Sequence, residues 1–283
     1  MSTVRIDAHQ HFIDYASGDY PWIDDRHEAL KRPFMPADLK PLLDSLSFDG
    51  SIAVQARPSL HETEWLLSLA DEFEFIYGVV GWVDLCSPAV SAQLERFSAH
   101  PKLKGIRHLI QDEPDDHFML RDDFLRGLRL LSKYGLTYDL LIHERHLPNA
   151  AALTQMFPEQ KFVLDHLAKP RIMEGKGQLD SWRSGIQELA KSPNVYCKLS
   201  GMVTEADWAH WRSEDFVPYL DTVFEAFGPE RLMIGSDWPV CTVSRDYRAV
   251  MGVVTAYIHP LPSEIQARIL GGNCARFYNI DEM

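Results

Sequence analysis

The chain has 283 residues and a formal net charge of −13 at pH 7, from 28 basic and 41 acidic residues. This negative charge argues against nucleic acid or an anionic membrane as a partner, because both would repel it. No apolar run approaches the roughly 18–20 residues that span a bilayer, and the N-terminus has no signal-peptide pattern. The four cysteines are scattered, which favours free thiols in a reducing compartment. We therefore expect a cytoplasmic protein.

Short β-type runs alternate with helical stretches along the whole chain, as in parallel βα units. The intervening segments 60–73 and 120–133 repeat apolar residues at three and four, which is typical of helices with one buried face. Eight such units in fewer than 300 residues favour a (β/α)8 TIM barrel, and no linker divides the chain. We expect residues 1–283 to form a single domain. The predicted strands lie near 4–11, 50–57, 75–83, 103–109, 136–143, 161–167, 194–200 and 231–237.

The first predicted strand ends in His9-Gln10-His11. Alternate side chains of a strand face the same side, so we expect Asp7, His9 and His11 to point one way. Two imidazoles one strand repeat apart can hold a metal ion or polarise a carbonyl from a rigid support. The carboxyl ends of the strands are also where barrel enzymes build their active sites. The pair therefore predicts the position of the site.

Polar residues also end the later predicted strands. Asp237 follows the apolar run of the eighth strand and precedes a Trp-Pro turn, which is an unusual place for a structural carboxylate. A carboxylate over a barrel mouth near several imidazoles can deprotonate water or bind a metal. The connections 12–35 and 201–215 are long and aromatic, so they are expected to wall the pocket. The other polar strand ends carry Arg107, His108, His143, His166 and Lys198.

Five segments in this order resemble the amidohydrolase superfamily, and more narrowly its lactonase branch of fuconolactonases, rhamnonolactonases and pyrone-dicarboxylate lactonases. The resemblance implies hydrolysis of a small cyclic ester. It implies Asp237 as the base, which later returns its proton to the departing ring oxygen, and His9, His11 and His166 around the carbonyl. The segments are residues 6–12, 54–58, 105–108, 164–170 and 234–239.

The sequence departs from the binuclear members of that superfamily, which bridge two metals with a carboxylated lysine on the fourth strand. Here that strand ends in Arg107-His108, and Lys104 lies at its start. We expect at most one zinc or other divalent ion, and the lactonase branch indicates that a metal is allowed but not required. The predicted metal ligands are His9, His11, His166 and Asp237.

The number of well-placed cationic side chains indicates the substrate class. A dicarboxylate would call for several converging arginines, whereas only Arg107 stands well placed at a strand end. A neutral, polyhydroxylated sugar-acid lactone such as fucono- or rhamnonolactone is therefore favoured, with Arg107 among the catalytic residues. Arg57 and Lys169 each precede a proline and are expected to brace loops. The predicted substrate-binding residues are His108, His143, Trp22 and Lys198.

Two other functions remain open from the sequence. A zinc-dependent decarboxylase of the same superfamily would also use His-x-His and a final-strand aspartate. A catalytically inactive barrel that acts as a binding protein would keep the fold without turnover. The oligomeric state is not indicated by the sequence.

Overall fold

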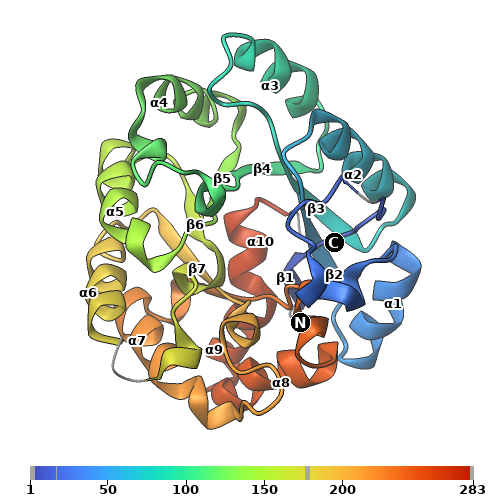
Figure 1. The fold of residues 1–283 in the computed structure, drawn as a ribbon, viewed down its shortest axis with the longest axis vertical. Helices are drawn as coiled ribbons and strands as arrows, with labels where there is room; N and C mark the ends of the chain where they lie inside the picture. Colours follow the sequence, from blue (N-terminus) through green and yellow to red (C-terminus); the bar gives the residue numbers. More distant parts are fainter. Residues whose placement is uncertain (1–3, 17, 176–178, 281–283) are drawn as a thin grey trace.

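The computed structural model describes residues 4–16, 18–175 and 179–280. Eight parallel strands follow one another in chain order around a barrel, as Figure 1 shows from one end. Backbone bonds from His11 N to Trp238 O (2.6 Å) and from Asp237 N to His9 O (2.8 Å) join the first and last strands. The predicted (β/α)8 barrel is confirmed. The strands are β1 Ile6–Gln10, β2 Gly50–Val54, β3 Ile76–Gly81, β4 Leu103–His108, β5 Thr137–Leu140, β6 Phe162–Leu164, β7 Val195–Leu199 and β8 Leu232–Ile234.

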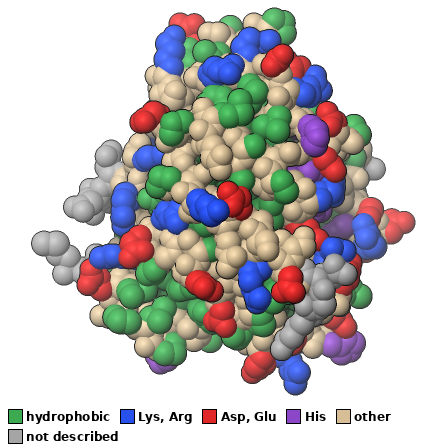
Figure 2. All heavy atoms as spheres, turned by 90° about the vertical axis from the view of Figure 1, so that its left-hand side faces the viewer, with side chains coloured by type: hydrophobic (Ala, Val, Ile, Leu, Met, Phe, Trp, Pro, Cys, Tyr) green, Lys and Arg blue, Asp and Glu red, His purple; other side chains and the backbone are tan. Residues whose placement is uncertain are grey.

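Helices surround the barrel and bury their apolar faces against the outward side of the strands (Figure 1). No helix in the described ranges is long and apolar enough to cross a membrane. On the face shown in Figure 2, acidic and basic side chains are interspersed with apolar ones. The helices are α1 Pro36–Ser45, α2 Leu60–Glu72, α3 Val90–Ser98, α4 Asp122–Leu128, α5 Leu147–Met156, α6 Leu179–Leu189, α7 Val217–Phe227, α8 Tyr247–Ile258, α9 Ser263–Ala267 and α10 Asn273–Phe277.

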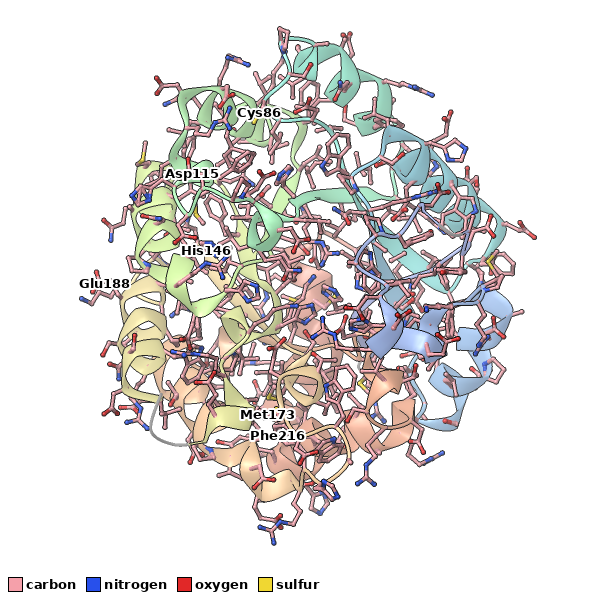
Figure 3. All side chains as sticks on the ribbon, in the orientation of Figure 1. Cys86, Asp115, His146, Met173, Glu188 and Phe216 are labelled. Atoms are coloured by element: carbon pink, nitrogen blue, oxygen red, sulfur yellow. The ribbon has the colours of Figure 1, made fainter. Side chains whose placement is uncertain are left out.

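Side chains fill the inside of the ring of strands (Figure 3). At the end of the barrel where the strands begin, the interior is apolar. Helix α10 closes this end with Cys274, Phe277 and the following Tyr278. These three side chains belong to the same buried cluster as the inward residues of the strands, so the barrel is a packed core that is open only at the opposite end. The strand residues of this cluster are Ile6, Ala8, Ile52, Val54, Val80, Val163 and Met233.

The predicted strands extend too far at their carboxyl ends. β6 ends at Leu164 and β8 at Ile234, so His166 and Asp237 lie in the turns that follow. Both residues have positive φ, 52° and 57°, which no strand residue adopts. The functional ends of these strands are therefore tight turns, which an apolar pattern does not reveal.

The expected common direction of Asp7, His9 and His11 is wrong for Asp7, whereas His9 and His11 point the same way, with their Nε2 atoms 3.2 Å apart. The register between β1 and β2 moves from Asp7 opposite Ser51 to Gln10 opposite Ala53, which places one extra residue in β1. Such a bulge reverses the alternation of side chains. Asp7 accordingly turns to the outer side, where its Oδ2 accepts from Tyr247 OH (3.1 Å), while His9 enters the barrel.

Candidate active site

Three imidazoles surround one carboxylate oxygen at the carboxyl end of the barrel. Oδ1 of Asp237 lies 3.3 Å from Nε2 of His11, 3.7 Å from Nε2 of His166 and 3.9 Å from Nε2 of His9. All four side chains are at most 5% exposed. The structure thus brings together the four residues that the sequence predicts as the centre of the site.

Each imidazole is oriented by a contact of its Nδ1. His11 Nδ1 lies 2.7 Å from the carbonyl oxygen of Val54, and because a carbonyl only accepts, this nitrogen carries the hydrogen. The Nε2 of His11 therefore faces Asp237. His166 Nδ1 lies 2.9 Å from Oγ of Ser200. The rings are therefore fixed before any ligand arrives.

A left-handed turn places His166. Residues 166–169 have φ between 50° and 60°, although none is glycine, and such residues cost on the order of 1–3 kcal/mol each. Trp182 Nε1 donates to Leu167 O (2.7 Å) and holds the turn. Gly201, at φ 65°, lies against the His166 ring, and a Cβ there would stand 2.4 Å from Nδ1. Only glycine at this position leaves room for the ring.

Four charges lie directly beneath the imidazoles. Lys198 Nζ donates to Asp139 Oδ2 (2.5 Å) and forms an ion pair with Asp165 Oδ1 (3.0 Å), and Arg107 Nη1 donates to Asp165 Oδ2 (3.0 Å). His9 Nδ1 contacts both Lys198 Nζ (3.1 Å) and Asp165 Oδ1 (3.3 Å). We call Arg107, Asp139, Asp165 and Lys198 the charge layer. It supports His9 from below.

Lys198 is wholly buried, and its ammonium group is taken up by this layer. The prediction that it binds substrate is therefore wrong. Asp139 and Asp165 raise the pKa of Lys198 against the effect of burial, so it stays charged. Sequence reasoning missed both carboxylates, although their inward positions at the ends of β5 and β6 match that of Arg107 on β4.

The surroundings of the site shift the pKa values of Asp237, His9 and His166. Burial alone would raise the pKa of Asp237, but His166, His11 and His9 outweigh it and hold that pKa below its usual range. Burial lowers the pKa of His166 to about 4 and that of His9 well below its ordinary value. At neutral pH these shifts favour an ionised Asp237 beside neutral His9 and His166.

A small pocket that is open to solvent lies above these groups. Trp22 forms part of its wall, as predicted, and its Nε1 donates to Ala56 O (2.9 Å). Lys169 also lines it, which corrects the expectation that this residue only braces a loop. The lining residues are His11, Trp22, Ala56, Arg107, Leu109, Gln111, Asp112, Leu141, His166, Lys169, Asp237 and Val240.

The amidohydrolase family model matches residues 6–280. The chain belongs to the amidohydrolase family. It is 40% identical over 291 residues to an L-fucono-1,5-lactonase of Burkholderia multivorans, covering 100% of this chain and 98% of that protein. An L-fucono-1,5-lactonase of Burkholderia ambifaria is 37% identical over 286 residues, with 99% and 97% covered. A solved amidohydrolase from Burkholderia multivorans with bound zinc superposes with a TM-score of 0.94 at 41% identity, covering 98% and 100% of the two chains.

This amidohydrolase has donor groups that fit a single divalent cation. Ligand atoms of His9, His166 and Asp237 all lie within 4.8 Å of one another, the one such cluster in the described part of the chain. His11 Nε2 lies 3.3 Å from the same Asp237 oxygen and can serve as a fourth ligand. Imidazole and carboxylate ligands without thiolates suit zinc.

Two of the predicted binding residues lie elsewhere in the amidohydrolase. His108 points away from the pocket, because residues 107 and 108 face opposite sides of β4. Its ring stacks on Phe118 at 4.8 Å and its Nε2 contacts Glu113 Oε1 at 2.7 Å, so its predicted substrate contact is wrong. His143 is half-buried beyond β5, outside the pocket lining among the described residues, and its role stays a prediction.

Two further tryptophans, Trp208 and Trp238, lie near the carboxyl end of the barrel. Trp238 packs edge-on against Phe12 and Phe34 in the core and is 3% exposed, so it does not cover the pocket. The Trp208 ring contacts that of His27 at a tilt of 50°, and His27 in turn contacts Trp22. The long connections after β1 and β7 therefore meet through these rings and form one side of the mouth.

Proposed function

We propose that this protein is a lactonase that opens a neutral sugar-acid lactone by attack of water, with Asp237 as the general base. The observation that carries the proposal is the buried Asp237 carboxylate, encircled by His9, His11 and His166 at the floor of a pocket. The L-fucono-1,5-lactonases that match nearly the full chain support a six-carbon aldonolactone as substrate. The free cysteines of the described chain support a cytoplasmic location.

The pocket favours a neutral ligand. Arg107 and Lys169 are the permanent cations among its lining residues, and Arg107 is 2% exposed and already bonded to Asp165. A dicarboxylate would find a single open cation to pair with. The lining also includes two carboxylates, Asp112 and Asp237, which would repel an anionic ligand. Trp22 offers a ring face on which a sugar ring can lie.

The geometry assigns the residues in order. Asp237 holds the attacking water and takes its proton. His9, His166 and Arg107 lie around the lactone carbonyl, where neutral N–H donors and a guanidinium stabilise the oxyanion that forms. His9, His11, His166 and Asp237 would hold one zinc ion. When bound, zinc would polarise the carbonyl and lower the pKa of a coordinated water.

The test is hydrolysis of a panel of aldonolactones, followed with a pH indicator. We expect turnover of fucono- or rhamnonolactone and a loss of about 10²–10⁴-fold in kcat for Asp237→Asn, the usual contribution of a positioned base. Asp180→Asn removes the same charge from an almost fully exposed site on α6 and serves as the matched control. Near-native kcat in Asp237→Asn would exclude the proposed base.

The same panel separates the two alternatives. A decarboxylase would leave the lactones intact and release carbon dioxide from an aromatic or vinylogous acid. An inactive binding barrel would turn over neither class while still binding a ligand. Zinc is tested by elemental analysis before and after chelation, together with the rate of each form. An unchanged rate in the metal-free form would mean that the histidines and Arg107 act unaided.

A further inference from the structure

The pocket holds one positive charge that the catalytic assignment above does not use. Lys169 lines the pocket, its side chain is 20% exposed, and its Nζ lies 3.7 Å from Oε1 of Glu205. Arg107, the other lining cation, is held by Asp165 and by the backbone and side chain of Gln55. Lys169 is therefore the cation that can reach an incoming ligand.

Its position relative to the site is fixed by the backbone. Lys169 ends the left-handed turn that begins with His166, and its N–H donates to the His166 carbonyl at 2.8 Å. In such a tight turn, side chains three residues apart lie on the same side. Trp182 holds this turn from the outside through Leu167 O. His166 and Lys169 thus reach the same pocket from one rigid segment.

Opening a lactone requires an acid as well as a base. When the acyl C–O bond breaks, both electrons go to the ring oxygen, and an alkoxide must be protonated as it forms. His9, His11 and His166 are turned toward Asp237, and the Arg107 guanidinium does not give up its proton. Lys169 places an ammonium group in the lining of the pocket, and this group can supply the proton.

We propose that Lys169 is the general acid that protonates the departing ring oxygen. The proposal rests on the lactonase function above. The Nζ proton passes to the ring oxygen, which becomes the hydroxyl of the product, while Asp237 retains the proton of the attacking water. Asp237 then releases its proton to solvent and the Lys169 amine takes one up, which restores both groups. The carboxylic acid that is formed ionises, so the cycle yields an aldonate and one proton. Glu205 is the positioning residue that directs Nζ toward the pocket.

The decisive experiment is chemical rescue of Lys169→Ala. We expect kcat for the best aldonolactone to fall by about 10²–10⁴-fold, the range of a general acid, with KM changed far less. Ethylammonium should restore part of the rate in proportion to its concentration. Tetramethylammonium, which has no proton to give, should not restore it at the same ionic strength. Lys191→Ala, an exposed lysine in an ion pair outside the barrel, is the matched control.

Lys169→Arg tests charge without acidity and serves also if the alanine variant does not fold. A guanidinium keeps the positive charge, so KM should stay near the wild-type value while kcat remains low. The proposal is overturned by wild-type kcat in either variant, by a rise in KM alone, or by equal effects of the two ammonium salts. If the wild type opens no lactone, the proposed function itself fails. If Asp237→Asn is inactive but Lys169→Ala is not, only the role of Lys169 fails.

Discussion

Gly201 gives the sharpest test of how the backbone positions the site. Its Cα faces the His166 ring, and an added Cβ would lie 2.4 Å from Nδ1, 2.5 Å from Cγ and 2.8 Å from Cβ of His166. Ordinary contacts of a Cβ begin at 3.4 Å. The Gly201→Ala substitution must therefore move the His166 ring by about 1 Å, or shift the β7 end by the same amount.

The cost has two parts that can be separated. An alanine at φ 65° is strained by about 1 kcal/mol, and forcing a methyl group into filled space costs about 1–3 kcal/mol more. We therefore expect the free energy of unfolding to fall by about 2–4 kcal/mol. A 1 Å misplacement of a reacting group can cost about 10²-fold, so kcat/KM should fall by that factor.

Gly135→Ala is the matched control, because Gly135 has nearly the same φ, 68°, with nothing within 4 Å of an added Cβ. It should lose about 1 kcal/mol of stability and retain full activity. Urea unfolding measures the stabilities, and lactone hydrolysis well below the unfolding midpoint measures kcat/KM. Wild-type kcat/KM in Gly201→Ala, or equal losses of activity in the two variants, would refute the reasoning.

Three further outcomes follow from the geometry. His108→Ala should lose about 1–3 kcal/mol of stability in urea through its stacking on Phe118, yet keep kcat and KM within about threefold; a large rise in KM would restore a substrate contact. Burial raises the pKa of Asp7 from 3.8 to about 6. Protonation of Asp7 therefore stabilises the fold below pH 4, and this stabilisation is lost as the pH rises through 6. Asp7→Asn should therefore gain up to about 3 kcal/mol relative to the wild type between pH 4 and 7, measured by unfolding at each pH; a constant difference would contradict the shift. Elemental analysis should find at most one zinc per chain and none in His11→Ala; two per chain would contradict the missing bridging lysine on β4.

The fold and the centre of the site could be predicted because they depend on pattern and order. Eight apolar runs separated by helical periodicity leave few alternatives to a closed parallel barrel. Polar residues at the carboxyl ends of such runs must converge at one mouth, which is why the proximity of His9, His11 and Asp237 could be predicted. The register bulge in β1 brought His9 into the barrel, and the prediction reached that outcome by assuming a regular strand.

The remaining errors share a physical cause. Whether Arg107 or His108 enters the barrel depends on one residue of register, which the sequence Ile-Arg-His does not fix. Lys198 faces inward as expected, but it forms ion pairs with Asp139 of β5 and with Asp165, which follows β6. The sequence does not show which residues of different strands will meet in this way. Lys169 enters the pocket through a left-handed turn of non-glycine residues, which no local preference indicates.

The charge layer explains how the site stays rigid at the edge of an apolar core. Two cations and two carboxylates lie between the apolar plug below and His9 above, and Tyr278 OH from the end of α10 donates to Asp139 Oδ2 at 2.8 Å. Removing one member of such a layer leaves an uncompensated buried charge, which lowers the free energy of unfolding by about 3–5 kcal/mol, whereas the complete set is neutral. The lysine and both carboxylates therefore have one satisfactory arrangement. Because His9 Nδ1 contacts two of them, that arrangement also fixes the imidazole from which the site is built.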